Sequence, residues 1–411
     1  MEVAGVRVLV APGASAAALL AVTAGVLLGT CSGLVPGLHV NSLALLLAAA
    51  APSVPGPPQL VGAAMLAAGV THSFLDVVPT LALGVPDAAM AVSALPGHRL
   101  VMGGRGREAL RVSALGSGVA VAVAFVLAVP VTAAATVVAP LVYDYLPVVV
   151  VALLLALLAR EPTRRARLGG CLAVAASGAL GVVALPLQPE SLLPAGDVLA
   201  PLFAGLFGAP VLLAAYRGAG VPEQDDPAVA GGPRSVVEPG FAGSIAGAAV
   251  AYVPGVSGAI AAVFAVEATR ADGDRAFVAA LSGVNTANTV FALYALFALG
   301  APHTGVLVAF ERAALPKTLP LLLASIALAA CAGAVLVPVL GDRYFRLVRR
   351  LNHRRLTADV CALLVVLAWV FAGWLGVALL AAATLVGLIP PRFGARRVHL
   401  MAVLLVPLAL S

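Results

Sequence analysis

The chain has 411 residues, of which 62% are hydrophobic and only 10% charged, and its formal net charge is +6. Soluble domains carry about 25% charged residues, so this composition excludes a soluble enzyme and predicts an all-α polytopic membrane protein of about ten to twelve segments. The excess of arginine fits loops that fix orientation in a membrane rather than nucleic-acid binding. The scattered cysteines have no Cys-x-x-Cys spacing and predict no metal site.

The first apolar run, 14–51, is interrupted by Val35-Pro36-Gly37. Proline removes a backbone donor and glycine relaxes the chain, so we expect two short helices, 14–35 and 38–51, in place of one. Further spans or near-spans are predicted at 59–84, 112–139, 146–159, 168–186 and 198–216. These segments make up the first predicted half, 1–216, and a polar linker at 217–240 follows it.

The second half, 241–341, opens with an apolar run that is broken in the same way, at Val253-Pro254-Gly255. Helices are expected on both sides of this break, at 241–253 and 256–268. Spans follow at 276–300 and 314–341. The C-terminal part, 342–411, is predicted to hold a basic loop, a helical hairpin at 358–390 and a tail segment at 398–410.

The two halves share landmarks at nearly one spacing. Pro254 follows Pro36 by 218 residues, and Pro302 follows Pro86 by 216. Proline and glycine are common in this chain, so a chance match is the alternative. We interpret the halves as repeats because the second landmark agrees with the first.

Arginine-rich loops predict the orientation of the chain in the cell membrane. We place four of them in the cytoplasm, namely 97–111, 160–167, 342–355 and 392–397. Counting spans between these loops puts the start of the first half outside and the start of the second half inside. The sequence therefore predicts two inverted repeats, an arrangement found in many secondary transporters.

The two Pro-Gly breaks predict a binding site for an anion. In a membrane, a broken helix is tolerated where protein or a water-filled cavity satisfies its backbone groups, and matching breaks in two halves indicate a substrate site. A helix that restarts there exposes free N–H groups and the positive end of its dipole. The candidate residues are Pro36, Gly37, His39, Asn41, Pro254, Gly255 and Ser257. The alternative is that the polar side chains only cap the helices.

Polar residues inside two other spans are further candidates. Substrate contacts are expected from Thr71, His72, Ser73, Asn285, Thr286, Asn288 and Thr289. His72 and Asp76 are four residues apart on one helical face, which suits a proton relay or a site for a coupling ion. We expect no cofactor beyond coupled Na⁺ or H⁺. The alternative for both groups is that they hold helices together.

These patterns favour a secondary active transporter of a small organic anion, such as a carboxylate, that works by alternating access with ion coupling. Such a protein is not an enzyme. One alternative is a flippase for a polyprenyl-phosphate-type lipid. A minor alternative is an intramembrane protease, because Gly255-Val-Ser257-Gly258 could supply a nucleophile and His303 a base.

Several landmarks occur in a characteristic order. The first half contains Gly29-x-x-x-Gly33-x-x-Pro36-Gly37, Gly84-x-Pro86 and Pro96-Gly97-His98. The second half contains Gly247, Val253-Pro254-Gly255, Asn285-x-x-Asn288 and Gly300-x-Pro302. Over residues 25–310 the chain resembles the large membrane subunit of the tripartite tricarboxylate transporters, especially its archaeal stand-alone branch.

This resemblance implies a secondary transporter, for citrate-like carboxylates in the bacterial case. It also implies two partners, a small membrane subunit and an extracytoplasmic solute-binding protein, and a homodimer is a further arrangement to test. His39, Asn41 and the stretch Thr71-His72-Ser73-Phe74 depart from the bacterial pattern, so the substrate is not carried over. A distant similarity to polyprenyl-phosphate translocases keeps the lipid phosphate as the alternative substrate.

Overall fold

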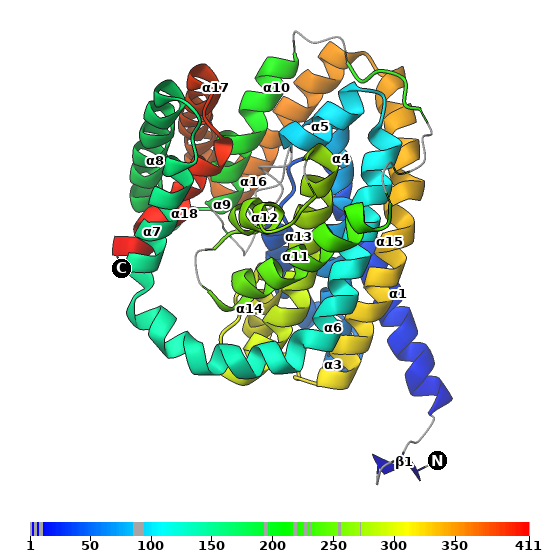
Figure 1. Cartoon of the computed structure of the whole chain (residues 1–411). Helices are drawn as coiled ribbons and strands as arrows, with labels where there is room; N and C mark the ends of the chain where they lie inside the picture. The colour runs from blue at the N-terminus through cyan, green and yellow to red at the C-terminus, as the bar shows by residue number, and fades with distance from the viewer. Residues whose placement is uncertain are drawn as a thin grey trace.

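The structure is a computed structural model. It describes residues 2–3, 6–7, 11–84, 94–192, 196, 198–216, 220–225, 229, 232–253, 256–271 and 273–410. Two short strands, β1 (Glu2–Val3) and β2 (Val6–Arg7), pair antiparallel ahead of the first helix. The rest of the described chain forms helices and their connections (Figure 1).

The helices of the first part are α1 (Pro12–Gly33), α2 (Val40–Ala50), η1 (Ala51–Ser53), α3 (Pro58–Leu75), α4 (Val77–Leu83), α5 (Ala94–Met102), α6 (Gly106–Asp144), α7 (Leu146–Ala159), α8 (Arg164–Ala184), α9 (Leu199–Phe203), η2 (Ala204–Gly208) and α10 (Ala209–Ala215). Those of the second part are α11 (Arg234–Tyr252), α12 (Gly258–Glu267), α13 (Gly273–Leu299), α14 (Gly305–Arg312), α15 (Leu319–Arg350), α16 (His353–Gly387), α17 (Ile389–Phe393), η3 (Arg397–Met401) and α18 (Ala402–Leu410). The all-α fold expected from the composition is confirmed.

The first predicted break separates α1 from α2. The chain leaves α1 after Gly33, turns through Gly37 at a φ of 78°, and re-enters a helix at Val40. A positive φ of this kind is accessible to glycine at little cost. Beyond the turn, α3 packs parallel to α1, because Gly25 and Gly29 approach Ala64 and Ala68 in the same order along both helices. Since α1 and α3 run the same way, the chain between them returns through the short helix α2.

The helices on either side of the second predicted break are arranged like those around the first. Helix α11 ends at Tyr252, α12 starts at Gly258, and Pro254 and Gly255 lie outside the described residues. Helices α11 and α13 are again parallel, because Gly243 approaches Ala280 and Gly247 approaches Val284. Small residues let both pairs of helices come close, as is usual between membrane helices.

The two helix pairs run in opposite directions. Asn285 of α13 bonds to Asp76 at the end of α3. Leu81, five residues after Asp76, and Val278, which precedes Asn285 in α13, both approach Gly97 of α5. Helix α13 therefore descends where α3 and α4 ascend. These directions are those expected for inverted repeats, although the repeat itself stays a prediction.

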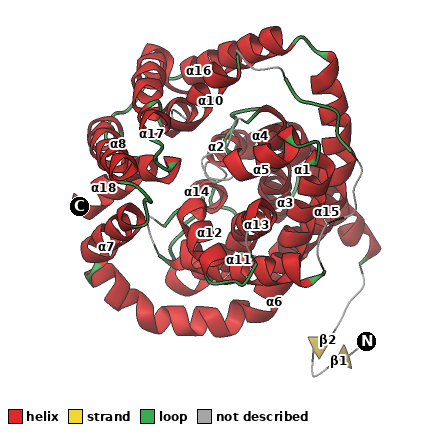
Figure 2. Ribbon diagram, turned by 45° about the horizontal axis from the view of Figure 1, so that its top comes forward, coloured by secondary structure: helices red, strands yellow, loops and turns green. Residues whose placement is uncertain are grey.

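Two large groups of buried side chains divide the molecule, as the two lobes in Figure 2 suggest. We call them core 1 and core 2. Core 1 is formed by α1–α6, α11 and α13–α15, and core 2 by α7–α9, η2, part of α16, η3 and α18. Helix α12 contributes to both, with Ala261 and Ala262 in core 1 and Ile260 in core 2.

Helix α6 joins the two cores. It begins in core 1, and in Figure 1 it descends and then curves along the bottom of the molecule to α7. Its 39 residues correspond to about 58 Å of helix, nearly twice the thickness of a bilayer core. Pro130 and Pro140 lie inside it and account for bending, because each removes a helical hydrogen bond.

Seven described helices are long and apolar enough to cross a membrane, and five shorter apolar helices accompany them. The chain is therefore a multi-pass membrane protein, while the expected count of ten to twelve segments stays a prediction. In α16, Ala372 and Gly373 are not helical, and Gly376 lies against Ala368, eight residues earlier. Residues eight apart in a straight helix are about 12 Å apart, so the chain folds back at this point, inside the expected hairpin.

The arginine-rich segments are mostly helical, so the expectation that they are loops is wrong. Helices α5 and α6 occupy nearly all of 97–111, and α15 and α16 occupy nearly all of 342–355. Arginine is a good helix former, and membrane helices can continue beyond the bilayer into charged turns. Within 160–167 and 392–397 the connecting turns are also short, because α8 begins at Arg164 and α17 ends at Phe393.

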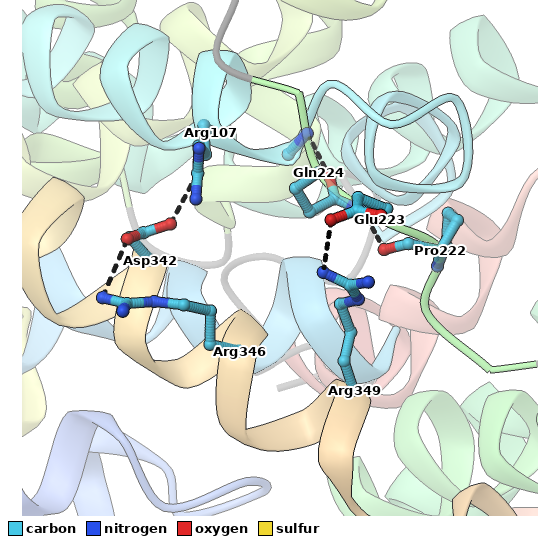
Figure 3. Close-up of polar contacts among 8 residues, drawn as sticks. Arg107, Pro222, Glu223, Gln224, Asp342, Arg346 and Arg349 are labelled. Carbon is cyan, nitrogen blue, oxygen red and sulfur yellow. Dashed lines mark hydrogen bonds and ion pairs between the residues drawn. The ribbon is translucent and has the colours of Figure 1, made fainter.

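All four arginine-rich segments lie at one end of the molecule, the upper end in Figure 1. Two contacts join these segments in pairs, Arg107 with Asp342 and Arg165 with the carbonyl oxygen of Arg392. Arg99 and Arg160 pair instead with Asp274 at the start of α13 and Glu267 at the end of α12. Figure 3 shows part of this network. We call this region the basic end.

Candidate functional site

A cavity of about 210 Å³ lies between core 1 and core 2. Three helices begin at its wall: α2 after His39, α12 after Ser257, and α14 after Thr304. The cavity is smaller than the roughly 300–1,000 Å³ of drug-sized ligand sites, which points to a small ligand. We call it the central cavity.

Each of the three helices is capped by a side chain at the cavity wall. The Asn41 N–H donates to His39 Nδ1 at 3.0 Å, and the Ile260 N–H donates to Ser257 Oγ at 3.3 Å. The Leu307 N–H donates to Thr304 Oγ1 at 3.4 Å. A cap satisfies one of the four free N–H groups of a helix start, so others remain for a ligand. Because His39 Nδ1 accepts a hydrogen bond, the proton of the neutral ring lies on Nε2, which is then a donor.

The starts of α2 and α14 are in direct contact. A β-carbon at Gly305 would lie 3.0 Å from the Asn41 Cα and would overlap the Asn41 side-chain oxygen. A glycine is therefore required at this position for the two helix ends to approach. Their positive dipole ends consequently point into the same small volume.

The polar face expected on α13 faces the central cavity. Asn285, Asn288 and Thr289 all line it. The Asn285 Nδ2 donates to the Ser73 carbonyl oxygen at 3.2 Å and to Asp76 Oδ2 at 3.0 Å. Asp76 itself is only 4% exposed. Asn285 thus connects the cavity wall to a buried carboxylate behind it.

No Asp, Glu, Lys or Arg is among the described residues that line the central cavity. Its two ionisable groups are His39 and His303. The His303 Nδ1 bonds to the Ala251 carbonyl oxygen, and its Nε2 lies 3.4 Å from the Tyr143 hydroxyl. The positive potential of the site therefore comes mainly from helix ends and neutral donors, a combination that suits an anion.

Seven of the residues expected at a binding site line the central cavity: His39, Asn41, Ser73, Ser257, Asn285, Asn288 and Thr289. Pro254 and Gly255 lie outside the described residues. Pro36, Gly37, Thr71, His72, Asp76 and Thr286 are not on the wall of this cavity. Whether any of these residues binds substrate or a coupling ion stays a prediction.

The residues away from the wall have other neighbours. His72 Nδ1 lies 2.9 Å from Ser32 Oγ on α1, and Thr71 packs on Gly29 of the same helix. The Thr286 hydroxyl donates to the Ser282 carbonyl oxygen within α13, at 2.9 Å. His72 and Asp76 therefore contact different helices, α1 and α13, even though they are one turn apart.

Core 2 supplies a wall that the sequence did not indicate. Leu199 and Phe203 come from the α9 segment, and Met401 and Leu404 come from η3 and α18. The Phe203 ring stacks on the His39 ring with centroids 5.7 Å apart. Apolar residues in distant apolar segments carry no sequence signal for a shared cavity, so only the fold could reveal them. Thr304 lies two residues after the Gly300-x-Pro302 landmark, and that position was the one available hint.

Comparison with known protein families matches residues 19–402 to the tripartite tricarboxylate transporter TctA family. The chain belongs to this family. This is the family that the sequence landmarks resemble. The curated proteins that it resembles include the uncharacterised protein MJ1079 of Methanocaldococcus jannaschii, which is 38% identical over 102 residues. That match covers 24% of this chain and 24% of the relative. No solved structure matches the chain.

Proposed function

We propose that this TctA-family protein is a secondary active transporter that binds a small organic anion, such as a carboxylate, in the central cavity. The observation that carries the proposal is the convergence of the starts of α2, α12 and α14 on one volume of about 210 Å³. Free N–H groups and helix dipoles at these ends favour a carboxylate without a paired arginine or lysine. Asn285, Asn288 and Thr289 add neutral donors.

We further propose that alternating access arises from movement of core 1 against core 2. The central cavity lies between them, with polar groups on the core 1 side and Phe203, Met401 and Leu404 on the other. Such an interface can separate without breaking a polar network, because the core 2 wall is apolar. The Asp76–Asn285 pair is the proposed link to a coupling ion, Na⁺ or H⁺, since an intramembrane carboxylate is functional by default.

The orientation and the partners follow from the same proposal. The basic end would face the cytoplasm, in accordance with the positive-inside rule. A small membrane subunit and an extracytoplasmic solute-binding protein would complete the tripartite system in the cell membrane, in which case the substrate arrives from the opposite end. Labelling in intact cells of cysteines introduced at Arg346, within the basic end, and at Thr136, in the C-terminal half of α6, would test this orientation.

The experiment is uptake of labelled dicarboxylates and tricarboxylates, and of a polyprenyl phosphate analogue, into proteoliposomes with Na⁺ or H⁺ gradients. We expect carboxylate uptake, at least tenfold slower for Asn41→Ala and Asn288→Ala. Asp76→Asn should weaken the dependence on the ion gradient. Thr136→Ala, at a half-buried position on α6 that does not line the central cavity, is the matched control and should behave like wild type.

Unchanged uptake in all three site variants would refute the proposed site. Transport of the polyprenyl phosphate alone would instead support the flippase alternative, which predicts a basic cavity lining. The protease alternative has no support in the geometry, because Ser257 Oγ is bonded to the Ile260 N–H and His303 to Ala251 and Tyr143. A nucleophile needs a base within hydrogen-bond reach.

A further inference from the structure

A second cavity, of about 380 Å³, lies at the basic end between α6 and α15, and it shares no lining residue with the central cavity. Its polar wall is made by four guanidinium groups and one carboxylate, from Arg107, Arg111, Arg343, Arg346 and Asp342. Leu110, Pro338 and Val339 complete it. We call it the arginine pocket.

The single carboxylate is shared between two of the arginines. Asp342 Oδ1 accepts from Arg107 Nε at 2.6 Å, and Asp342 Oδ2 pairs with Arg346 Nη2 at 3.1 Å (Figure 3). Among the described residues, no carboxylate pairs with Arg343. The pocket therefore keeps a clear excess of positive charge. Its ligand should be an anion of more than one negative oxygen, because guanidinium groups bind phosphate in a bidentate manner.

The surface next to the arginine pocket is apolar and exposed. On α15, Val335 and Val339 are 63% and 44% exposed, and they lie on the same helical face as Arg343. On α6, Leu115 is 52% exposed one turn beyond Arg111. Two adjacent helices thus change from exposed apolar to basic side chains at the same level. This is the pattern expected where a bilayer's acyl chains end and its headgroups begin.

The two helices are held close together at this level. A β-carbon at Gly341 of α15 would lie 2.6 Å from the Leu110 side chain of α6, so the glycine allows direct contact. The contact fixes the arginines of both helices around one cavity rather than leaving them as separate surface charges. Arg349, which lies one turn beyond Arg346, pairs instead with Glu223 and stands outside the pocket (Figure 3).

We propose that the arginine pocket binds the phosphate headgroup of an anionic membrane lipid, with the acyl chains along the apolar face of Val335, Val339 and Leu115. A free soluble phosphate would use the same guanidinium groups but would gain nothing from the exposed apolar face. This lipid site does not depend on the function proposed for the central cavity. It would place an anionic lipid at the junction of α6 and α15.

The test uses tryptophan fluorescence quenched by brominated lipids in phosphatidylcholine bilayers that contain phosphatidylglycerol. The two native tryptophans, both on α16, are replaced by phenylalanine, and Val339→Trp supplies the reporter. We expect phosphatidylglycerol to be preferred over phosphatidylcholine by about tenfold at this reporter, because each arginine near a surface contributes about fivefold. A reporter at Val126→Trp, an exposed position on α6 away from the pocket, should show a ratio near one.

Arg343→Gln with Arg346→Gln should lower the ratio at the Val339→Trp reporter to below about threefold. Arg349→Gln with Arg350→Gln, on the same helix but outside the pocket, is the matched control and should leave it unchanged. Inorganic phosphate at matched ionic strength should not displace the lipid. Equal ratios at both reporters, or no effect of the pocket substitutions, would overturn the proposal, and displacement by inorganic phosphate would assign the pocket to a soluble anion.

Retention of phosphatidylglycerol by the protein without a reporter, measured by native mass spectrometry, covers the case in which Val339→Trp does not fold. The wild type should retain it in preference to phosphatidylcholine. The Arg343→Gln, Arg346→Gln variant should lose that preference. Equal retention by both proteins would again overturn the lipid site.

Discussion

The hydrogen bond between Asn285 and Asp76 offers a sharp test of the wall behind the central cavity. The variant Asn285→Asp keeps the shape of the side chain but replaces the donor with a second carboxylate oxygen, about 3.0 Å from Asp76 Oδ2. With an effective dielectric constant of about 20, two unit charges at this distance repel by about 5.5 kcal/mol. Uptake of a proton would relieve the repulsion, and it costs about 4 kcal/mol at pH 7 for a carboxyl group with a reference pKa near 3.9. The expected loss of stability is therefore limited to about 4 kcal/mol.

The exchange of both residues, Asp76→Asn with Asn285→Asp, should recover about half of this loss. The donor and acceptor are then present again with their positions reversed. Recovery is incomplete, because the Ser73 carbonyl oxygen, which accepts from Asn285 at 3.2 Å, would face a carboxylate. The coupling free energy between the two positions should be at least about 2 kcal/mol, because any cost of Asp76→Asn alone adds to it.

The assay is unfolding of the four proteins in detergent, the wild type, both single variants and the exchange, at pH 7 and pH 5. The deficit of Asn285→Asp should shrink at the lower pH, because proton uptake then costs only about 1.5 kcal/mol. The reasoning fails if Asn285→Asp unfolds like the wild type at pH 7. It also fails if the exchange is no more stable than Asn285→Asp alone.

Three further predictions concern other contacts. Gly181→Val should abolish accumulation of folded protein in immunoblots of membrane fractions, because its side chain would overlap a backbone carbonyl of α18. The control Gly118→Val, at a position with open space around it, should accumulate normally. Ser257→Ala should cost only about 1 kcal/mol of stability through loss of the α12 cap, and a fall in substrate affinity of more than tenfold in uptake assays would separate binding from capping. Glu108→Gln should lower the free energy of unfolding by about 3 kcal/mol, because this buried carboxylate pairs with Arg105 and Arg275. Asp274→Asn should lower it by less than 1 kcal/mol, because its partner Arg99 is largely exposed, and equal effects of the two variants would contradict this distinction.

Hydropathy and the backbone properties of proline and glycine were enough to predict the membrane helices and the position of one helix break. The break at Pro36 and Gly37 could be located because these residues disfavour a continuous helix in any surroundings. The polar face of Asn285, Asn288 and Thr289 could be predicted from helical spacing alone. The family was also accessible, because the order of the Gly and Pro landmarks is specific.

Other features depended on information that the local sequence lacks. Helix α3 is buried on almost every side, so hydropathy could not show that His72 faces α1 rather than the cavity. A cluster of arginines does not show by itself whether it lies in a loop or in a helix, and α15 continues through such a cluster to Arg350. The apolar wall from Phe203 and Met401 belongs to segments that meet only after core 2 has packed.

The curved helix α6 has a mechanical consequence for a protein built from two cores. Any displacement of core 2 relative to core 1 must bend or tilt this 39-residue connection, whose lipid-facing length exceeds the bilayer core. The bilayer deforms together with α6, and the energetic cost of this hydrophobic mismatch depends on the acyl-chain length of the lipids. Membrane thickness would thereby set part of the energy difference between two relative positions of the cores.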